Sequence, residues 1–220
     1  MPTVETDLAS DSRSEIKQAS ASAAESAASA DARSRLIDAA TRLICARGVG
    51  ATGIDAVIAE AGVAKATLYR AFGSKERLVE AVLDRHSQRW CDWFNGRLDA
   101  AQGSPAERLF VVFDLLADWF ASPDFRGCPI LNAIGEGPDT GDGPRRVASR
   151  HKGRLAPRLL SLAQEAGADD PEALVEALFL LMDGAIVVAM AARSPLAAAT
   201  ARAAFAALMR DRLGPAAVAG

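Results

Sequence analysis

The chain has 220 residues, of which 50% are hydrophobic and 24% are charged, and its net charge is −3. This length suffices for a small domain and a larger domain with its own core. Because alanine is abundant and clusters of β-branched residues are sparse, the composition favours helices. Three cysteines without a CxxC or Cys/His cluster argue against a disulfide framework or a metal site and fit a reducing cytosol. No secretory signal is expected, because the N-terminus lacks a basic start followed by an apolar run.

Residues 1–30 are rich in serine and alanine and nearly free of large apolar side chains. They can bury too little apolar surface to offset the entropy of ordering, so we expect a disordered or weakly helical tail. This segment carries two basic and five acidic groups, whereas residues 31–75 carry seven basic and four acidic groups. The second segment is therefore locally positive, which suits a phosphate-bearing partner, although many helical domains carry as much charge.

Helical spacing of apolar residues begins at Asp31 and predicts a first helix that ends at Gly48. Two shorter helices are expected at about 54–61 and 65–72. Gly62 between them permits a sharp turn because glycine has no Cβ. The buried stripe of the first helix consists of Leu36, Ile37, Ala40, Leu43 and Ile44.

The two shorter helices have the pattern of a helix-turn-helix unit. Thr52 and Asp55 fit an N-cap and capping-box pair at the start of the first of them. Leu68 and Phe72 lie four residues apart and give the second helix a buried edge. Cationic and hydroxyl side chains occupy its other faces, as expected of a helix that enters a DNA groove.

The remaining sequence predicts further helices and completes an all-α fold of about nine helices. A long helix capped by Ser74 runs to about Ala101, and Pro105 opens a helix that Ser122 and Pro123 end. A short helix is expected at 129–134, and after a Gly/Pro-rich loop three more at about 145–166, 171–193 and 195–213. Pro157 is expected to kink the first of these three. The apolar stretch 177–192 contains Asp183, and fits a helix buried on several sides better than a membrane span.

Several motifs follow one another in a single order within residues 33–83. They are Arg35-Leu-Ile-Asp-Ala-Ala, Leu43-Ile44 before Arg47-Gly48, Ile58-Ala-Glu-Ala-Gly-Val, Thr67-Leu-Tyr69, Phe72-Gly-Ser-Lys-Glu76 and Leu78. This part of the chain resembles the N-terminal domain of the TetR/AcrR family of bacterial transcriptional regulators. Gly53 and Ala64 depart from the pattern, because the family often has Ser or Thr there. Residues 125–136 resemble a segment that recurs in one branch of the family.

The resemblance implies an all-helical homodimer. Its N-terminal three-helix domain would bind operator DNA, and its larger C-terminal domain would bind a small-molecule effector and make the dimer. We therefore expect a tail at 1–30, a helix-turn-helix DNA-binding domain at 31–76, and an effector-binding and dimerisation domain at 77–220.

By this resemblance, the second short helix reads DNA. Lys65 and Thr67 lie near its N-terminus, where side chains reach base edges. Tyr69 would contact a phosphate, and Lys75 and Thr52 would contact the DNA backbone. A surface helix with solvated charges is the alternative. The candidate DNA-binding residues are Thr52, Lys65, Ala66, Thr67, Tyr69, Arg70 and Lys75.

Aromatic and apolar residues at helical spacing beyond residue 77 suggest a mostly apolar effector pocket between helices. Ordinary core is the alternative for each of them, and a hydrogen-bonded core position is the alternative for His86. Asn132 could instead cap the turn around Gly135. The candidate effector-binding residues are His86, Trp90, Trp93, Phe113, Leu116, Phe120, Cys128, Asn132, His151 and Met182.

Cys128 supports a rival in which the repressor senses thiol oxidants or electrophiles. If Cys128 begins a helix, the helix dipole and Arg126 would lower its pKa. A small buried hydrophobic residue is the other interpretation. A basic run on the helix at 145–166 fits a solvated face better than a second nucleic-acid surface. It consists of Arg145, Arg146, Arg150, Lys152, Arg154 and Arg158.

The last two helices are apolar and rich in small residues that permit close helix packing. In the family, these helices of two subunits form a four-helix interface, whereas a doubly buried helix in a monomer is the alternative. The candidate dimer residues are Leu174, Leu178, Leu181, Gly184, Ala185, Val188, Phe205 and Leu208.

These observations favour a cytoplasmic, homodimeric repressor that binds a palindromic operator and is released by a small apolar or amphipathic effector. We expect no cofactor, no metal and no membrane partner. An enzyme is the remote alternative. The chain has two histidines and shows no Ser/His/Asp set, no metal-ligand spacing and no phosphate loop.

Overall fold

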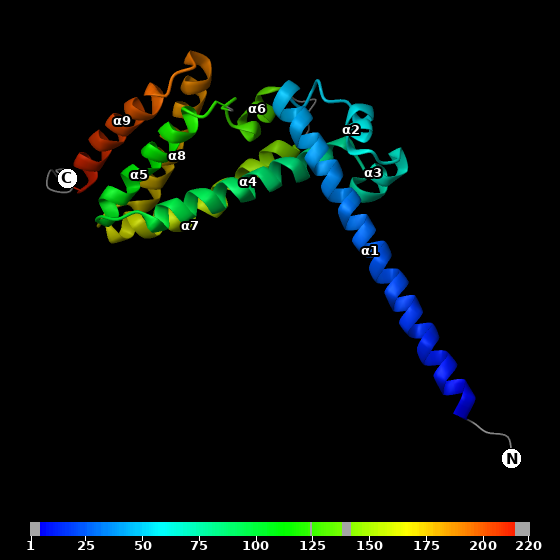
Figure 1. The fold of residues 1–220 in the computed structure, drawn as a ribbon. Helices are drawn as coiled ribbons and strands as arrows, with labels where there is room; N and C mark the ends of the chain where they lie inside the picture. The colour runs from blue at the N-terminus through cyan, green and yellow to red at the C-terminus, as the bar shows by residue number, and fades with distance from the viewer. Residues whose placement is uncertain (1–4, 124, 138–141, 214–220) are drawn as a thin grey trace. The chain divides into compact units, whose positions relative to one another are not determined.

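A computed structural model of the chain describes residues 5–123, 125–137 and 142–213, with side chains described at 23, 25–123, 125–137 and 142–210. Over these residues the fold consists of α-helices joined by loops, which confirms the predicted all-α class (Figure 1). The helices are α1 (Glu5–Arg47), α2 (Ile54–Ala61), α3 (Lys65–Phe72), α4 (Lys75–Ala100), α5 (Pro105–Phe120), α6 (Pro129–Gly135), α7 (Gly143–Glu165), α8 (Pro171–Ala192) and α9 (Leu196–Leu213).

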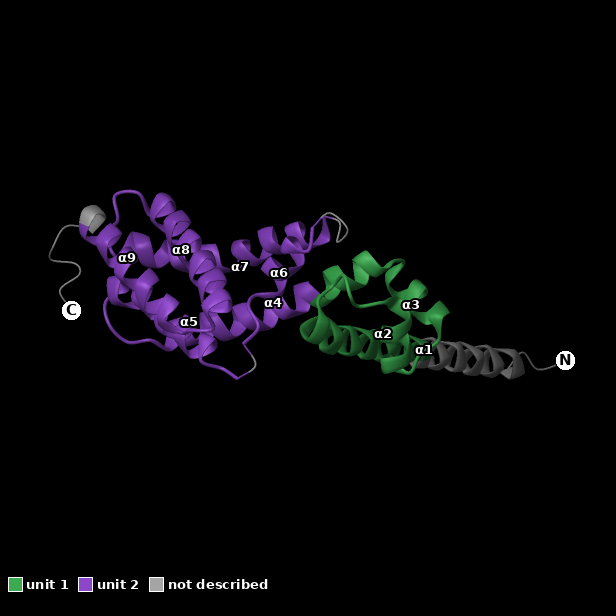
Figure 2. Cartoon of the chain, turned by 90° about the horizontal axis from the view of Figure 1, so that it is seen from above, with its two compact units in different colours: residues 1–82 green, residues 83–220 purple. Residues whose placement is uncertain are grey.

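The chain divides into two compact units, Met1–Val82 and Leu83–Gly220, which Figure 2 colours green and purple. The boundary falls inside α4, so this helix contributes to both units. The division that we expected at residue 76 also lies in α4.

In the first unit, α1 packs against α2 and α3. The apolar stripe predicted for the first helix supplies most of its side of this core, since Leu36 is 0% exposed and Ile44 is 7% exposed. Val57 from α2 and Leu68 and Phe72 from α3 are buried against it. The second unit has its own core, in which α5 packs against α7, α8 and α9.

The first thirty residues differ from a purely disordered tail, because α1 extends back to Glu5. Alanine's high helix propensity accounts for this backbone conformation. The described side chains at 25–31 are all exposed, so this stretch of α1 makes no buried packing contact. That the stretch adds nothing to the stability of the body remains a prediction.

Local sequence signals position the second unit's helices. At the start of α5, Ser104 Oγ accepts from the backbone N–H of Glu107, and the Glu107 carboxylate accepts from the Ser104 N–H, which completes a capping box. Ser74 caps α4 as expected, because its Oγ accepts from the N–H of Arg77. Helix α7 runs past Pro157 as one helix.

Helix α8 is long and apolar enough to cross a membrane. A single helix of this kind is weak evidence for a membrane span, because core helices of soluble proteins have the same length and hydropathy. Of its most apolar window, 44% is buried within the chain. One side of α8 therefore belongs to the core, while another side is exposed, so within the subunit the stretch 177–192 is not buried on several sides as expected. Helix α8 is therefore a core helix that also presents an apolar surface to solvent.

Candidate functional site

Helices α2 and α3 form the helix-turn-helix unit that the sequence predicts. Gly62 ends α2 in the left-handed conformation, with φ 63° and ψ 41°, and its N–H donates to Ala59 O. The following N–H, of Val63, donates to Ile58 O at 3.3 Å. A side chain at position 62 would strain this turn, so glycine is required to place α3 at its angle to α2.

The predicted cap of α2 is wrong. Gly53 occupies the N-cap without a side-chain hydrogen bond. Thr52 lies one residue earlier and is only 3% exposed, and its hydroxyl donates to Gly48 O at 2.6 Å. The hydroxyl therefore closes the turn between α1 and α2. Because it is buried and already engaged, Thr52 is not available as a phosphate contact, which corrects its place among the DNA-binding candidates.

Two arginines of α1, which sequence analysis did not single out, hold the ends of the recognition unit. Arg35 donates to Gly62 O at 3.0 Å, at the turn between α2 and α3. Arg33 donates to Ala71 O at 3.0 Å, and its guanidinium lies 4.3 Å from the centre of the Phe72 ring. A cation at the C-terminal end of a helix also suits the helix dipole. Arg35 begins the first of the family motifs, whereas Arg33 lies outside them and had no signal in the sequence.

Helix α3 presents its polar residues to solvent, away from its buried edge. Tyr69 is 44% exposed, which is unusual for a large aromatic ring and leaves its phenol free to reach a partner. Lys65 is exposed and pairs with Asp55 of α2 at 3.2 Å. Such an exposed pair is weak and exchanges readily for a phosphate or base. Of the other candidates, the exposed residues are Ala66 and Arg70, and the half-buried ones are Thr67 and Lys75.

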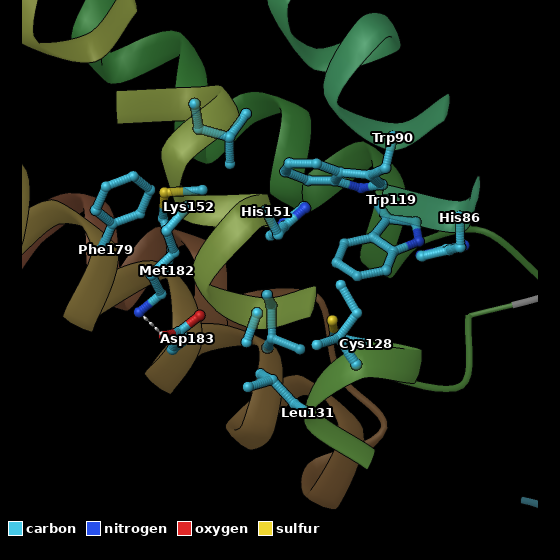
Figure 3. Close-up of a pocket in the computed structure, with 14 residues that line it drawn as sticks. His86, Trp90, Trp119, Cys128, Leu131, His151, Lys152, Phe179, Met182 and Asp183 are labelled. Atoms are coloured by element: carbon cyan, nitrogen blue, oxygen red, sulfur yellow. Dashed lines mark hydrogen bonds and ion pairs between the residues drawn. The ribbon is translucent and has the colours of Figure 1, made fainter. Parts of the chain in front are cut away.

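The second unit contains a pocket between α4, α5, α6, α7 and α8, with a free volume of about 40 Å³. Figure 3 shows Trp90, Trp119 and His86 at one end, Phe179, Lys152 and Asp183 at the other, and His151 between them. Aliphatic side chains and Cys128 complete the walls. The lining residues are His86, Trp90, Trp119, Cys128, Ile130, Leu131, Ala148, His151, Lys152, Leu155, Phe179, Met182, Asp183 and Ile186.

Five of the effector-binding candidates line this pocket, and five do not. Those that line it are His86, Trp90, Cys128, His151 and Met182. Trp93 lies outside, in a hollow that it shares with Arg89, His86, Trp90 and Trp119.

The other four candidates have different environments. Phe113 and Leu116 are core residues, 1% and 0% exposed, and Phe113 packs on Phe205 at 5.5 Å. Phe120 faces a separate surface groove. Asn132 donates to Arg126 O at 3.0 Å and holds the loop before α6, so it is neither in the pocket nor a cap for Gly135.

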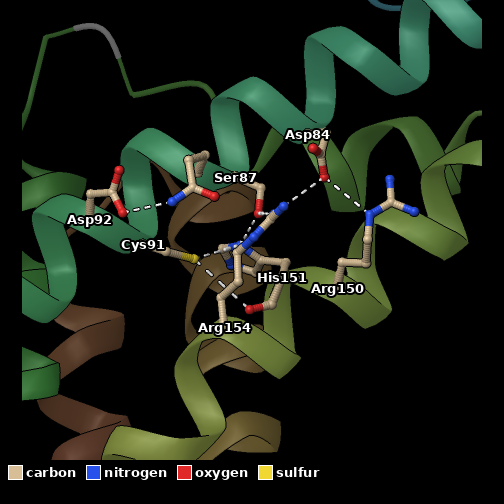
Figure 4. Close-up of polar contacts among 8 residues, drawn as sticks. Asp84, Ser87, Cys91, Asp92, Arg150, His151 and Arg154 are labelled. Carbon is tan, nitrogen blue, oxygen red and sulfur yellow. Dashed lines mark hydrogen bonds and ion pairs between the residues drawn. The ribbon is translucent and has the colours of Figure 1, made fainter.

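A polar cluster joins α4 to α7 behind the pocket wall (Figure 4). Arg154 donates to Ser87 Oγ at 2.7 Å and to Asp84 Oδ1 at 3.0 Å. His151 Nδ1 lies 3.0 Å from Ser87 Oγ and 3.3 Å from Cys91 Sγ. Ser87 accepts from Arg154, and its own proton can be donated to His151 Nδ1 in the tautomer that carries the ring proton on Nε2.

The two histidines of the pocket are held neutral. Burial lowers the pKa of His151 from 6.5 to about 4, with the nearby His86, Arg154 and Lys152 acting in the same direction and Asp183 opposing them. Burial also lowers the pKa of His86. At the charged end, Lys152 and Asp183 pair at 2.7 Å. Among the described residues that line it, the pocket therefore holds one ion pair and no further charged side chain.

The basic run on α7 is ion-paired rather than simply solvated. Four of its six residues reach acidic partners on α4 and α8, at N···O distances of 2.6 to 3.1 Å. This use of the charges speaks against a second nucleic-acid surface. The pairs are Arg150 and Arg154 with Asp84, Arg158 with Asp99, and Lys152 with Asp183.

Cys128 occupies the N-cap of α6, as the thiol-sensing hypothesis requires. Hydrogen bonds from the N–H groups of Leu131 and Ile130 act to lower its pKa, but burial outweighs them and raises the pKa above the usual value. The side chain is 8% exposed. The expected lowering of the pKa is therefore wrong, and the thiolate that reacts with oxidants is disfavoured.

Four of the dimer candidates are buried within the subunit and belong to its core. They are Leu174, Leu178, Ala185 and Phe205, with exposures of 2%, 0%, 5% and 0%. Gly184 and Val188 are exposed, and Leu181 and Leu208 are half-buried. The apolar side chains that α8 and α9 do present to solvent include Leu180, Val187, Val188, Met190 and Leu196.

Comparison with known proteins identifies relatives that share this sequence pattern and this fold. Residues 36–82 match the family model described as bacterial regulatory proteins of the tetR family. The HTH-type transcriptional repressor ComR of Escherichia coli (strain K12) is 32% identical over 121 residues, which cover 54% of this chain and 58% of ComR. The chain thus spans little more than half the length of this curated relative.

Two solved structures align over much more of the chain. The TetR-family transcriptional regulator SCO4454 from Streptomyces coelicolor has a TM-score of 0.71 and 31% identity, covering 84% of this chain and 97% of that one. The sav143 tetr-transcriptional regulator from Streptomyces avermitilis has a TM-score of 0.66 and 32% identity, covering 79% and 97%. These relatives are regulators and not enzymes, in line with the sequence. The chain belongs to the TetR family of transcriptional regulators.

Proposed function

We propose that this protein is a cytoplasmic, homodimeric repressor that binds a palindromic operator and is released by a small apolar or amphipathic effector. The observation that carries the proposal is the recognition helix. Leu68 and Phe72 on its buried edge pack in the core of the first unit. Lys65, Tyr69 and Arg70 on its other faces are exposed. A helix so held, with cationic and phenolic side chains outward, suits the major groove and its phosphates.

The pocket of the second unit supports the response to an effector. It is enclosed mainly by apolar side chains, with a few polar groups at its two ends, which is the usual composition of a small-molecule site. Two of its wall residues, His86 and Trp90, lie on α4, and α4 begins at Lys75 in the unit that carries α3. A ligand that favours one position of α4 would shift the population of operator-competent dimers.

The exposed side of α8 and the start of α9 supports the dimer. Leu180 is 76% exposed, Val188 is 55% exposed and Leu196 is 72% exposed. Leu180, Gly184, Val187 and Val188 recur at helical spacing, so they lie along one stripe of α8. An apolar stripe of this kind next to a paired helix is typical of an interface, and two recognition helices related by a twofold axis would read two half-sites.

The alternatives are weaker. A thiol switch at Cys128 is disfavoured because burial raises the pKa of that thiol. An enzyme is disfavoured because the polar groups of the pocket are a balanced ion pair and neutral histidines, without a nucleophile in an activated state.

The decisive test selects DNA from a random pool with the purified protein and measures its affinity for the selected duplex and for a scrambled duplex. We expect a near-palindromic site and a steep loss of affinity with salt, because several phosphates are neutralised. An effector should weaken the operator complex, and the operator should weaken effector binding by the same factor. Equal affinity for selected and scrambled DNA at moderate salt contradicts the proposal.

A further inference from the structure

Trp90, which lines the pocket, carries a buried polar atom that lacks a partner. Trp90 Nε1 is buried and has no hydrogen-bond partner among the described residues. Leaving a buried donor unpaired costs about 1–3 kcal/mol. The Trp90 ring is held in place by its neighbours. It stacks on Phe94 with 4.9 Å between ring centres and makes an edge-type contact with Trp119 with 5.9 Å between ring centres. The donor therefore cannot relieve its state by a free rotation of the side chain.

His86 lies four residues before Trp90 on the same helix and lines the same end of the pocket. Because burial lowers its pKa, its ring is neutral near pH 7. A neutral imidazole offers one donor and one acceptor. The aromatic end of the pocket thus brings together Trp90, whose N–H is unpaired, and a ring that can give or take a hydrogen bond. Because this N–H is covered, a ligand reaches it only when the surrounding walls move.

The opposite end of the pocket is already charge-balanced. Lys152 Nζ and Asp183 Oδ2 lie 2.7 Å apart, and Lys152 also lies 5.4 Å from the centre of the Phe179 ring. A ligand with a net charge would need one of these partners to leave the other, or would remain unpaired between apolar walls. Both outcomes are costly, since a desolvated charge without a partner is expensive.

The free volume of about 40 Å³ also limits the ligand. It is smaller than the cavity of roughly 150 Å³ that holds benzene in a protein interior. A single ring therefore requires the walls to move, and the side chains that can do so are Lys152, which is 45% exposed, and the half-buried Phe179. A ligand larger than one or two rings would have to separate the helices.

We infer that this pocket binds a small, uncharged, ring-containing molecule of the phenol class, whose oxygen accepts from Trp90 Nε1 and whose ring lies between the apolar walls. The inference rests on the proposed function for its regulatory meaning, but its chemistry concerns the pocket alone. The ligand's hydroxyl proton can be donated to the neutral ring of His86. The same oxygen thus satisfies both polar groups at the aromatic end.

Four probes that share one tolyl body test the inference by calorimetry on the full chain without DNA. They are toluene, p-cresol, 4-methylbenzoate and 4-methylbenzylamine, and p-cresol stays neutral near pH 7 because phenols titrate near pH 10. We expect p-cresol to bind at least about five- to tenfold more tightly than toluene, because toluene makes neither of its two hydrogen bonds. Both charged probes should bind at least about tenfold more weakly than p-cresol.

Trp90→Phe removes the donor and keeps an aromatic ring. It should reduce the advantage of p-cresol over toluene to the part that the His86 contact supplies, while changing toluene affinity by less than about twofold. The matched control is Trp93→Phe, one turn further on α4 and outside the pocket, which should keep the advantage. In the wild type, p-cresol should shift the Trp90 indole N–H resonance downfield, and toluene should not.

If Trp90→Phe does not fold, the ranking of the probes and the indole shift in the wild type still decide. A charged probe that binds most tightly, p-cresol and toluene of equal affinity, or no binding at millimolar concentration each overturns the inference. Operator binding is measured separately. A protein that binds its operator but fails this ranking loses the inference alone, whereas one that ranks the probes as expected without binding DNA loses the proposed function.

Discussion

His151 Nδ1 lies 3.0 Å from Ser87 Oγ, although 64 residues separate the two in sequence. The same imidazole lines the pocket. One side chain therefore belongs both to the wall that would meet a ligand and to the polar cluster that joins α4 to α7. Protonation of His151 would remove the acceptor that Ser87 faces and add a charge beside Arg154 and Lys152.

This relationship predicts a loss of stability in mild acid. The pKa of His151 is lowered from 6.5 to about 4 in the folded chain, so the unfolded chain takes up the proton first as the pH falls. The contribution of neutral His151 to the free energy of unfolding is complete above about pH 6.5 and declines as the pH falls towards 4. At pH 5 the free energy of unfolding is lower by about 2 kcal/mol for this reason. Urea unfolding of the wild type and of His151→Gln, at equal protein concentration, measures it.

Burial also lowers the pKa of His86, which both proteins retain, so the difference between their pH profiles reports the titration of His151 together with its coupling to His86. The wild type should lose more stability between about pH 7 and pH 5 than the variant does. Parallel profiles would show that His151 is not held neutral by the fold.

For DNA binding, we expect two kinds of effect from the exposed face of the recognition helix. Tyr69→Ala and Lys75→Ala should weaken binding to all sequences about equally, and loss of a phosphate contact by Lys75 should reduce the salt slope by about 1. Lys65→Ala or Thr67→Ala should also change base preference, at about 1–3 kcal/mol for a base contact. Fluorescence anisotropy with the selected duplex and its single-base variants gives both quantities.

The control for these variants is Arg97→Ala, which removes an exposed cation from the second unit; its side chain is 57% exposed. It should leave operator affinity and salt slope unchanged. If Arg97→Ala weakens binding as much as Lys75→Ala does, the effect comes from net charge and not from the recognition unit.

The exposed stripe of α8 predicts how substitutions separate assembly from folding. Gly184 has open space around it in the subunit, so Gly184→Trp should lower dimer content while the monomer folds normally. Leu178→Ala, at a position 0% exposed, should instead cost about 2–5 kcal/mol of folding stability. Sedimentation and unfolding of both variants distinguish the two effects, and a fully dimeric Gly184→Trp protein would refute the interface.

The N-terminal segment should be dispensable for stability. Deleting residues 1–30 is expected to change the melting temperature by no more than about 2 °C, because the described side chains at 25–31 are exposed. DNA affinity should rise slightly, since an acidic segment is removed. A longer deletion through residue 40 removes the buried Leu36 and Ala39 and should unfold the first unit. A large drop with the shorter deletion would show that the segment packs on the body.

The response to an effector should not depend on Cys128. Because this thiol is 8% exposed and burial raises its pKa, Cys128→Ser should keep the release of operator by a reversible ligand. Mass spectrometry of peptides from the wild type after mild oxidant should find no adduct on Cys128, in contrast to the exposed Cys45. An adduct on Cys128 that accompanies loss of DNA binding would restore the thiol switch.

The sequence by itself determined the helices and the recognition unit, because their signals are local. Helical spacing, Gly62 and Ser74 act on neighbours within one turn, and the predicted bounds of α2 and α3 agree with the structure. Even here, Thr52 shows a limit. Its residue type suits a cap, but the direction of the backbone turns its hydroxyl towards Gly48.

Only the tertiary structure decided which buried residues face a pocket and which face a core. Phe113 on α5 and Trp90 on α4 each belong to an apolar stripe at helical spacing. Phe113 nevertheless packs on Phe205 in the core, whereas Trp90 lines the pocket. Likewise Leu178 is buried and Leu180 is 76% exposed on one apolar helix. Helical periodicity indicates that a side chain is buried. Which side chain it contacts depends on packing between segments far apart in sequence, as between Ser87 and His151, and no local sequence pattern predicts such a contact.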